Sequence, residues 1–195
     1  EELAEESTTV IDPKDDIKTI FAFASEWEVG SSKDRVRTAR KILLEREDET
    51  IEYIIENKLD TKSGLVYRAI KEFAQNCTDI KPLIKFGLSA TKERIIKNTI
   101  RLIGDLEDET YLTVFKKFLE ENNHTGTILS SLGKIATPEC TKILGNYIHD
   151  ENVFLRVICS RSLKKINSET SLNLLMQMEK DECFLIDSMI RIMRK

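Results

Sequence analysis

Residues 47–50 read EDET, and the same four letters return at residues 107–110. Each copy is followed by an apolar run, IEYIIENKL at 51–59 and YLTVFKKFL at 111–119. The spacing of apolar residues in both runs is typical of an amphipathic helix. We interpret the tetrapeptide as a joint between two helices, and the step between its copies as two periods of an internal repeat of about thirty residues.

A small residue four positions before a large apolar residue marks each repeat. Successive small residues are separated by steps of 30, 30, 32 and 31 along the chain. Residues four apart share one face of a helix, so each pair predicts a helix with a buried stripe. The five pairs are Ala39 with Leu43, Ala69 with Phe73, Thr99 with Ile103, Ser131 with Ile135, and Ser162 with Ile166.

The pattern predicts an all-α chain of about five antiparallel helix pairs, stacked as an α-solenoid with a capping helix at each end. The opening residues are acidic and rich in Ser and Thr, so we expect a disordered tail over 1–11. A single domain then covers 12–195. Its parts are a capping helix at 12–30, repeats at 31–59, 60–90, 91–121, 122–150 and 151–181, and a second capping helix at 182–195.

Local signals agree with helix starts at the joints. Thr137 before Pro138 predicts an N-cap with proline at the first helical position, and Asp12 before Pro13 predicts the same for the first helix. Pro82 falls within a first turn, where its missing N–H costs little. We expect Trp27 to fill the core of the first capping helix.

Composition restricts the class of protein. Seven glycines and three prolines in 195 residues favour helix, and no apolar stretch is long enough to span a membrane. Four cysteines without CxxC spacing favour reduced, buried thiols in a cytoplasmic protein. A secreted or periplasmic protein with disulfides stays open if a leader has been removed.

The segment LRVICSRSLKKI at 155–166 resembles the second helix of a HEAT repeat, with Leu155, Arg156, Cys159 and Ser162 at the motif positions. HTGTILSSLGKIA at 124–136 is similar but lacks the arginine. The short period is similar to that of HEAT-like repeats in relatives of phycobilin lyases. The resemblance covers about residues 31–181 and implies a HEAT- or armadillo-like right-handed superhelix, without implying a reaction.

Motifs for catalysis or metal binding are missing from the sequence. His124 and His149 lie in different repeats without ligand spacing to other histidines, cysteines or carboxylates, so we expect no metal and no cofactor. No glycine-rich phosphate loop or nucleophile motif occurs. We therefore predict no catalytic residue and a non-enzymatic protein. A bilin-lyase-like or chaperone-like activity is a lower alternative.

Basic residues recur on the face of the second helices opposite the apolar stripe, which predicts a basic ridge along the stack. The second helices of HEAT-like stacks line the concave side, so the resemblance implies that this ridge lies in the groove. We interpret this ridge as the binding face for an acidic partner, with two exposed apolar residues beside its cations. The alternative is that the cations are solvated and pair with acidic neighbours. The ridge comprises Arg37, Lys41, Tyr67, Arg68, Lys71, Lys97, Arg101, Leu129, Arg161 and Lys164.

The expected function is a scaffold that binds a protein or an acidic peptide in this groove. Nucleic acid is the second candidate ligand, and it ranks lower because aromatic residues hardly interleave with the cations. We expect no membrane association, and the sequence leaves the oligomeric state open.

Overall fold

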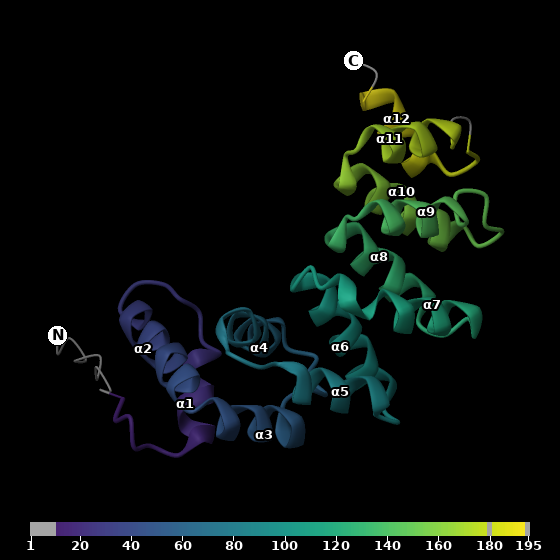
Figure 1. The fold of residues 1–195 in the computed structure, drawn as a ribbon. Coiled ribbons are helices and arrows are strands. Elements are labelled where there is room, and N and C mark those ends of the chain that lie inside the picture. The colour runs from purple at the N-terminus through teal and green to yellow at the C-terminus, as the bar shows by residue number, and fades with distance from the viewer. Residues whose placement is uncertain (1–10, 179–180, 194–195) are drawn as a thin grey trace. The chain divides into compact units, whose positions relative to one another are not determined.

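The structure is a computed structural model that describes residues 11–178 and 181–193. These residues form α-helices and one short 3-10 helix, and contain no strand (Figure 1). The all-α prediction is confirmed. Contacts divide the chain into two compact units, unit 1 ending at Thr99 and unit 2 beginning at Ile100, within one helix. The single continuous domain stays a prediction.

The helices of unit 1 follow the predicted repeats closely. The sequence predicts the first capping helix within residues 12–30, and the observed helix is shorter, from Ile17 to Ala24. The elements are α1 (Ile17–Ala24), α2 (Ser32–Glu45), α3 (Glu47–Asn57), α4 (Gly64–Asn76), α5 (Lys81–Ser89) and α6 (Glu93–Asp105), whose last residues belong to unit 2.

Unit 2 likewise contains helices at the predicted places, with short turns between them. Its elements are η1 (Glu109–Tyr111), α7 (Leu112–Glu120), α8 (Thr125–Ile135), α9 (Pro138–Gly145), α10 (Val153–Ile166), α11 (Glu169–Gln177) and α12 (Phe184–Met193).

Alternate helices pack side by side within each unit. In unit 1, α2 contacts α4 and α3 contacts α5, while α1 packs against both α2 and α3. In unit 2, α8 contacts α10, α9 contacts α11, and α10 contacts α12. Each unit therefore has two rows of helices, as expected when each helix pair buries its apolar face against the next pair.

The five marker residues of the repeat are all buried, at Ala39, Ala69, Thr99, Ser131 and Ser162. In unit 2 the reason for their small size is visible. A Cβ added at Gly104 would lie 2.6 Å from Cβ of Ser131, and one added at Gly133 would lie 2.7 Å from Cβ of Ser162. The Ser131 hydroxyl also donates to the Ile100 carbonyl at 3.0 Å. Small residues recur here because neighbouring helices cross in close contact.

The predicted helix caps are partly confirmed. Thr137 accepts a hydrogen bond from the backbone N–H of Cys140, and Pro138 opens α9. Pro82 lies in the first turn of α5. The prediction for Asp12 is wrong, because Asp12 closes a turn with Asp15 and the side chain of Asp16 caps α1 instead.

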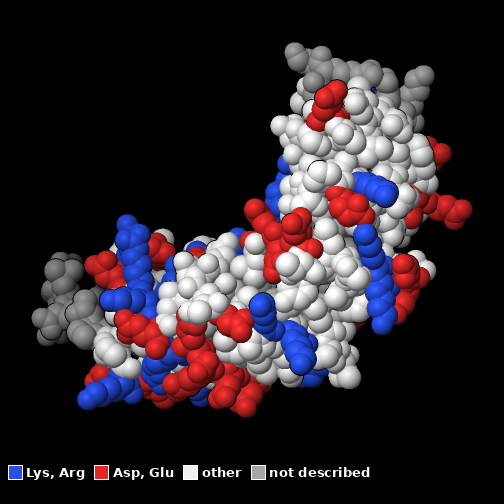
Figure 2. Space-filling model, viewed as in Figure 1, with Lys and Arg blue, Asp and Glu red and all other residues white. Residues whose placement is uncertain are grey.

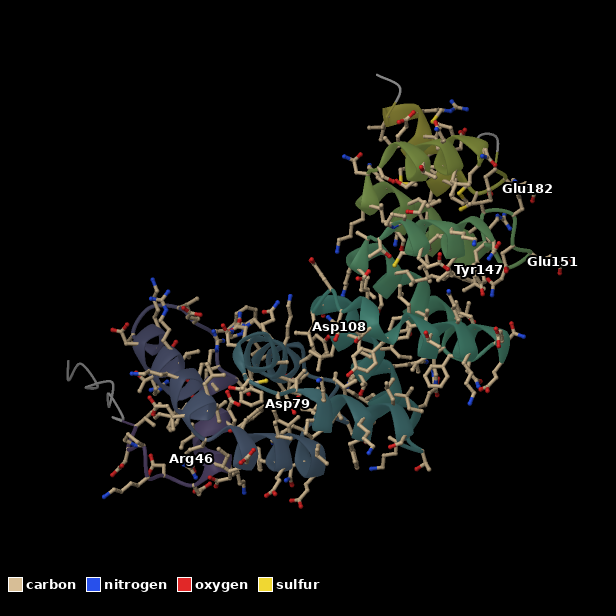
Figure 3. All side chains as sticks on the ribbon, in the orientation of Figure 1. Arg46, Asp79, Asp108, Tyr147, Glu151 and Glu182 are labelled. Atoms are coloured by element: carbon tan, nitrogen blue, oxygen red, sulfur yellow. The ribbon has the colours of Figure 1, made fainter. Side chains whose placement is uncertain are left out.

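The two EDET segments adopt different structures. In the first, Glu47 opens α3 directly, and the hydroxyl of buried Thr50 donates to the Leu43 carbonyl at 2.9 Å. In the second, Glu107 takes a left-handed conformation with φ of 56°, and Asp108 caps η1. Figure 3 labels Arg46, just before the first segment, and Asp108 in the second. Both EDET segments lie at the joint between paired helices. Only the segment at 47–50 is helical from its first residue.

The ends of the chain differ from the prediction. Of the expected tail, residues 1–10 lie outside the described residues, and Ile11 is buried. Trp27 is 63% exposed in the loop after α1, so its predicted place in a core is wrong. The helix ends three residues earlier, at Ala24, and the tryptophan leaves the apolar stripe. Within the described residues, no helix is long and apolar enough to cross a membrane.

Candidate protein-binding face

The ridge cations of unit 1 are largely paired with carboxylates. Arg37 forms an ion pair with Glu28, and Lys41 lies 3.7 Å from Glu45. The remaining pairs are Arg68 with Glu72 at 3.7 Å and Lys97 with Glu93. Lys71 is half-buried and also interacts with another residue. Unit 1 therefore fits the alternative in which ridge cations pair with acidic neighbours.

Several of these arginines hold the loop between α1 and α2. Arg40 takes the place of an apolar residue found in the other repeats, and its guanidinium contacts Glu28 and Glu72 at 2.8 and 2.6 Å. Arg68 donates to the Glu26 carbonyl at 3.0 Å and lies over the Trp27 ring at 5.6 Å. The exposed tryptophan is thus fixed by cation–π contact, and the sequence pattern did not single it out as a surface residue.

Two predicted ridge residues are not on the surface. Tyr67 is 5% exposed and Leu129 is fully buried, so the prediction that both are exposed is wrong. Leu129 lies on α8 where α10 packs, and its carbonyl accepts a hydrogen bond from the Ser162 hydroxyl at 2.9 Å. A helix that packs against neighbours on two sides buries more than one face. A helical wheel divided into one apolar and one exposed face does not predict this.

The ridge cations on α10 of unit 2 differ from those of unit 1. Arg161 and Lys164 are exposed, and no carboxylate of the described residues lies within ion-pair distance of either. The same holds for Lys165 beside them. Helix α10 contains four cations and no Asp or Glu. We define the basic face of α10 as Arg161, Lys164 and Lys165.

The basic face of α10 has a partial alternative explanation. Lys164 and Lys165 stand in the last turn of the helix, where cations favour the negative end of the macrodipole. Arg161 lies a turn earlier, beyond the reach of that effect. The macrodipole therefore accounts for the two lysines and leaves the arginine unexplained.

An open hollow of about 400 Å³ lies over α8, with Arg101 of α6 and Ile158 of α10 also in its lining. Arg101, also predicted for the ridge, is exposed and lines this hollow. Lys134 lines it too, but is paired with Asp105 at 2.7 Å. Residues three and four apart share a helix face, so Ile158 in the hollow lies on the same face of α10 as Arg161, and Arg161 on the same face as Lys165. The hollow and the basic face thus form one surface of unit 2.

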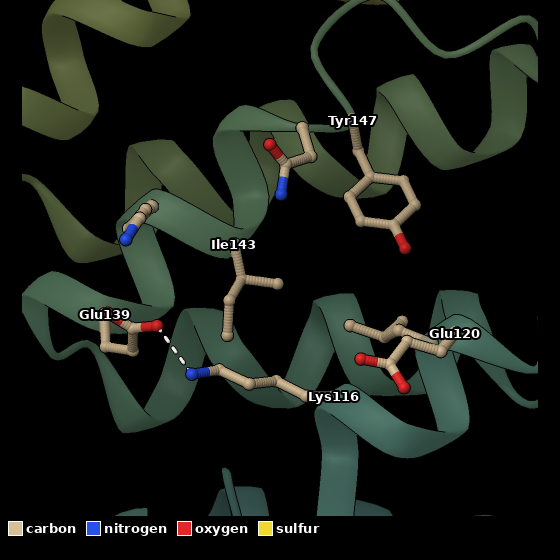
Figure 4. Close-up of a pocket in the computed structure, with 8 residues that line it drawn as sticks. Lys116, Glu120, Glu139, Ile143 and Tyr147 are labelled. Carbon is tan, nitrogen blue, oxygen red and sulfur yellow. Dashed lines mark ion pairs between the residues drawn. The ribbon is translucent and has the colours of Figure 1, made fainter. Parts of the chain in front are cut away.

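A second pocket of about 330 Å³ lies between α7 and α9, with Ile143 and Leu119 as its apolar lining (Figure 4). Lys116 pairs with Glu139 at 2.7 Å, and this hydrogen bond lowers the pKa of the Glu139 carboxyl. Burial raises the pKa of the Tyr147 phenol, so it stays protonated at neutral pH. The pocket mixes charges of both signs and contains no nucleophile beside a base.

The cysteines do not suggest catalysis. All four are free thiols. Burial raises the pKa of Cys77 to about 11 and of Cys159 to about 12, which disfavours the reactive thiolate. In the part of the chain that the structure describes, no three His, Cys, Asp or Glu side chains are grouped to hold a metal ion.

Comparisons with protein-family models, with curated proteins and with solved structures found no match to this chain.

Proposed function

We propose that the chain is a non-enzymatic α-solenoid scaffold of HEAT-like repeats, which binds an acidic segment of a partner protein on the basic face of α10. The recurrence of buried small residues at steps near thirty supports the repeat. The packing of alternate helices within each unit supports the solenoid.

One observation carries the binding proposal. Arg161 and Lys164 are exposed without an ion pair among the described residues, while ridge cations of unit 1 are paired, namely Arg37, Lys41, Arg68 and Lys97. Cations that are already paired offer a partner little, because binding would first have to separate an existing pair. Unpaired cations beside a hollow can instead pair with the partner's carboxylates, which steers encounter and adds specificity.

The surroundings of the basic face favour a protein over a nucleic acid. Phe154 is exposed at the start of α10, and Ile158 lies one turn further along the same stripe toward Arg161. This mixture of apolar and cationic groups suits a peptide with acidic and apolar residues. Binding of single-stranded nucleic acid usually employs several aromatic stacking platforms, and this stripe holds one.

The proposal is tested with a fluorescent peptide of alternating Glu and Leu and with an oligo-dT strand of equal charge. We expect the peptide to bind the wild type, and Arg161→Glu with Lys164→Glu to weaken it at least about tenfold, a loss of about 1.4 kcal/mol. The matched control is Lys81→Glu with Lys85→Glu on α5, which changes the net charge equally at two exposed lysines. The control should bind as the wild type does.

Two results would contradict this assignment. Equal weakening in both double variants would mean that only net charge matters. Tighter binding of oligo-dT than of the peptide, with a steep dependence on salt, would assign the face to nucleic acid.

A further inference from the structure

Helix α3 presents a row of carboxylates that mirrors the basic face of α10. Asp48, Glu52 and Glu56 are exposed at spacings of four residues, so they share one side of the helix. No Lys or Arg of the described residues lies within ion-pair distance of them. We define these three residues as the acidic row of α3. Figure 2 shows acidic side chains gathered over α3.

The acidic row is not explained by local structure. Like charges four apart destabilise a helix by about 0.2–0.5 kcal/mol per pair. Acidic residues favour a helix start, but this accounts only for Asp48, since Glu52 and Glu56 lie beyond the first turn. Other carboxylates of α3 do have partners, because Glu49 pairs with Arg46 and Glu47 accepts from Thr78.

The two helices are complementary in charge. α3 carries five carboxylates and no cation, whereas α10 carries four cations and no carboxylate. Each leaves charges unpaired on its exposed side, and both helices are of similar length, at 11 and 14 residues. Opposite surfaces of this kind attract one another and exclude wrong partners by like-charge repulsion.

We propose that the basic face of α10 binds the acidic row of α3 from a second copy of the chain. This inference rests on the proposed function, since it names the acidic partner of the same face. The contact joins two different surfaces, so it is heterologous, and it generates a ring or an open-ended chain according to whether the rotation closes. Being exposed and electrostatic, it weakens as salt shortens the Debye length.

The experiment is a charge swap read by sedimentation velocity on the full chain. The variants are Glu52→Lys with Glu56→Lys on α3, Arg161→Glu with Lys164→Glu on α10, and all four changes together. The fourfold variant keeps the wild-type net charge of −4, because two reversals of each sign cancel. Circular dichroism and thermal melting establish that each variant is folded.

At about 20 mM salt, where screening is weak, we expect the wild type to sediment above its monomer mass of 22.5 kDa and to dissociate at about 500 mM. Either double variant should be monomeric at both salt concentrations. The fourfold variant should associate again as the wild type does, since reversed charges still attract. This recovery would not follow from net charge alone.

The outcomes separate this inference from the proposed function. A monomeric wild type at low salt, or a folded fourfold variant that stays monomeric, would overturn self-association. Neither result affects binding of the Glu–Leu peptide, which the α3 double variant should bind at least as tightly as the wild type does, because no second copy then competes for the basic face of α10. Loss of peptide binding in the α10 variant with unchanged self-association would also overturn the inference, because the copies would then meet elsewhere.

Discussion

Units 1 and 2 share the regular spacing of buried small residues but use their charges differently. In unit 1 the arginines of α2 and α4 contact Glu26, Glu28 and Glu72, and so hold the loop before α2. In unit 2 the central helix α10 holds half-buried Arg156 in an ion pair with Asp181 and leaves its other cations exposed. A column of cations in a repeat sequence therefore does not mark a binding face until the partners of each cation are known.

The turns of the two units differ as well. In the described part of unit 1, the only residue with positive φ is Gly30. Among its described residues, unit 2 places five other than glycine in the left-handed region, at Glu107, Asn122, His124, Ala136 and Asn167. A side chain in this conformation costs about 1–2 kcal/mol, least for Asn. Unit 2 therefore contains more local strain than unit 1.

The largest effect is expected from the half-buried ion pair between Arg156 and Asp181 in unit 2. Arg156 donates to both Asp181 oxygens at 2.8 and 3.1 Å, and the two side chains are 15% and 8% exposed. Arg156→Ala should lower the free energy of unfolding by about 3 kcal/mol, because Asp181 is left buried without its cation. Urea unfolding measures this. The contrast is Arg37→Ala in unit 1. The Arg37 side chain is 58% exposed, so its removal should hardly change the free energy of unfolding. Equal losses of unfolding free energy in the two variants would contradict this difference between the units.

The same pair contributes to the response of unit 2 to acid. The hydrogen bond from Arg156 lowers the pKa of the Asp181 carboxyl. Its contribution is present above the unfolded carboxyl pKa of about 3.9 and is lost as pH falls through the lower folded value. We expect Asp181→Asn to lower stability at pH 7 and to flatten its decrease below about pH 4. A variant that keeps the wild-type slope in acid would exclude this carboxyl as the cause.

A smaller loss is expected where helices cross at small residues. Gly133→Val in unit 2 would press on both Cβ and Cα of Ser162, so it should destabilise by about 2 kcal/mol. Gly64→Val on α4 is the control, because no atom lies within 4 Å of the added Cβ. Thermal unfolding of the two variants compares them. A tolerated valine at residue 133 would mean that the helices can move apart at little cost.

The smallest effect should be a gain. Ala136 ends α8 at φ of 60°, whereas Ala90 ends α5 of unit 1 at φ of −66°. Ala136→Gly relieves a left-handed side chain and should stabilise by about 0.5–1 kcal/mol. Ala90→Gly should destabilise by a similar amount, since it only adds freedom to the unfolded chain. Opposite shifts in Tm would support the difference in backbone strain between the two helix ends. Shifts of the same sign would contradict it.

Much of the local fold follows from the sequence. Apolar periodicity and short polar joints place the helices to within a few residues, because both signals are local. The marker residues from Ala39 to Ser162 are buried as predicted, since a small residue at a helix crossing is a packing requirement. Thr137 with Pro138 predicts its cap correctly for the same local reason.

Features that depend on distant contacts could not be read from the pattern. Leu129 and Tyr67 are buried by neighbouring helices that a single helical wheel does not contain. Trp27 looks like a core residue by type, and it is exposed because α1 ends three residues before it. The ion pair of Arg37 with Glu28 and the hydrogen bond of Arg68 to the Glu26 carbonyl depend on how the loop before α2 folds, so only the structure distinguishes these arginines from Arg161.

The exposed tryptophan has a practical consequence for measurement. Trp27 is the only tryptophan of the chain and belongs to unit 1. Its emission therefore reports on the melting of that half alone, while far-ultraviolet dichroism follows helices in both. Recording the two signals in one titration shows, without any attached dye, whether the halves unfold as one cooperative system or in sequence.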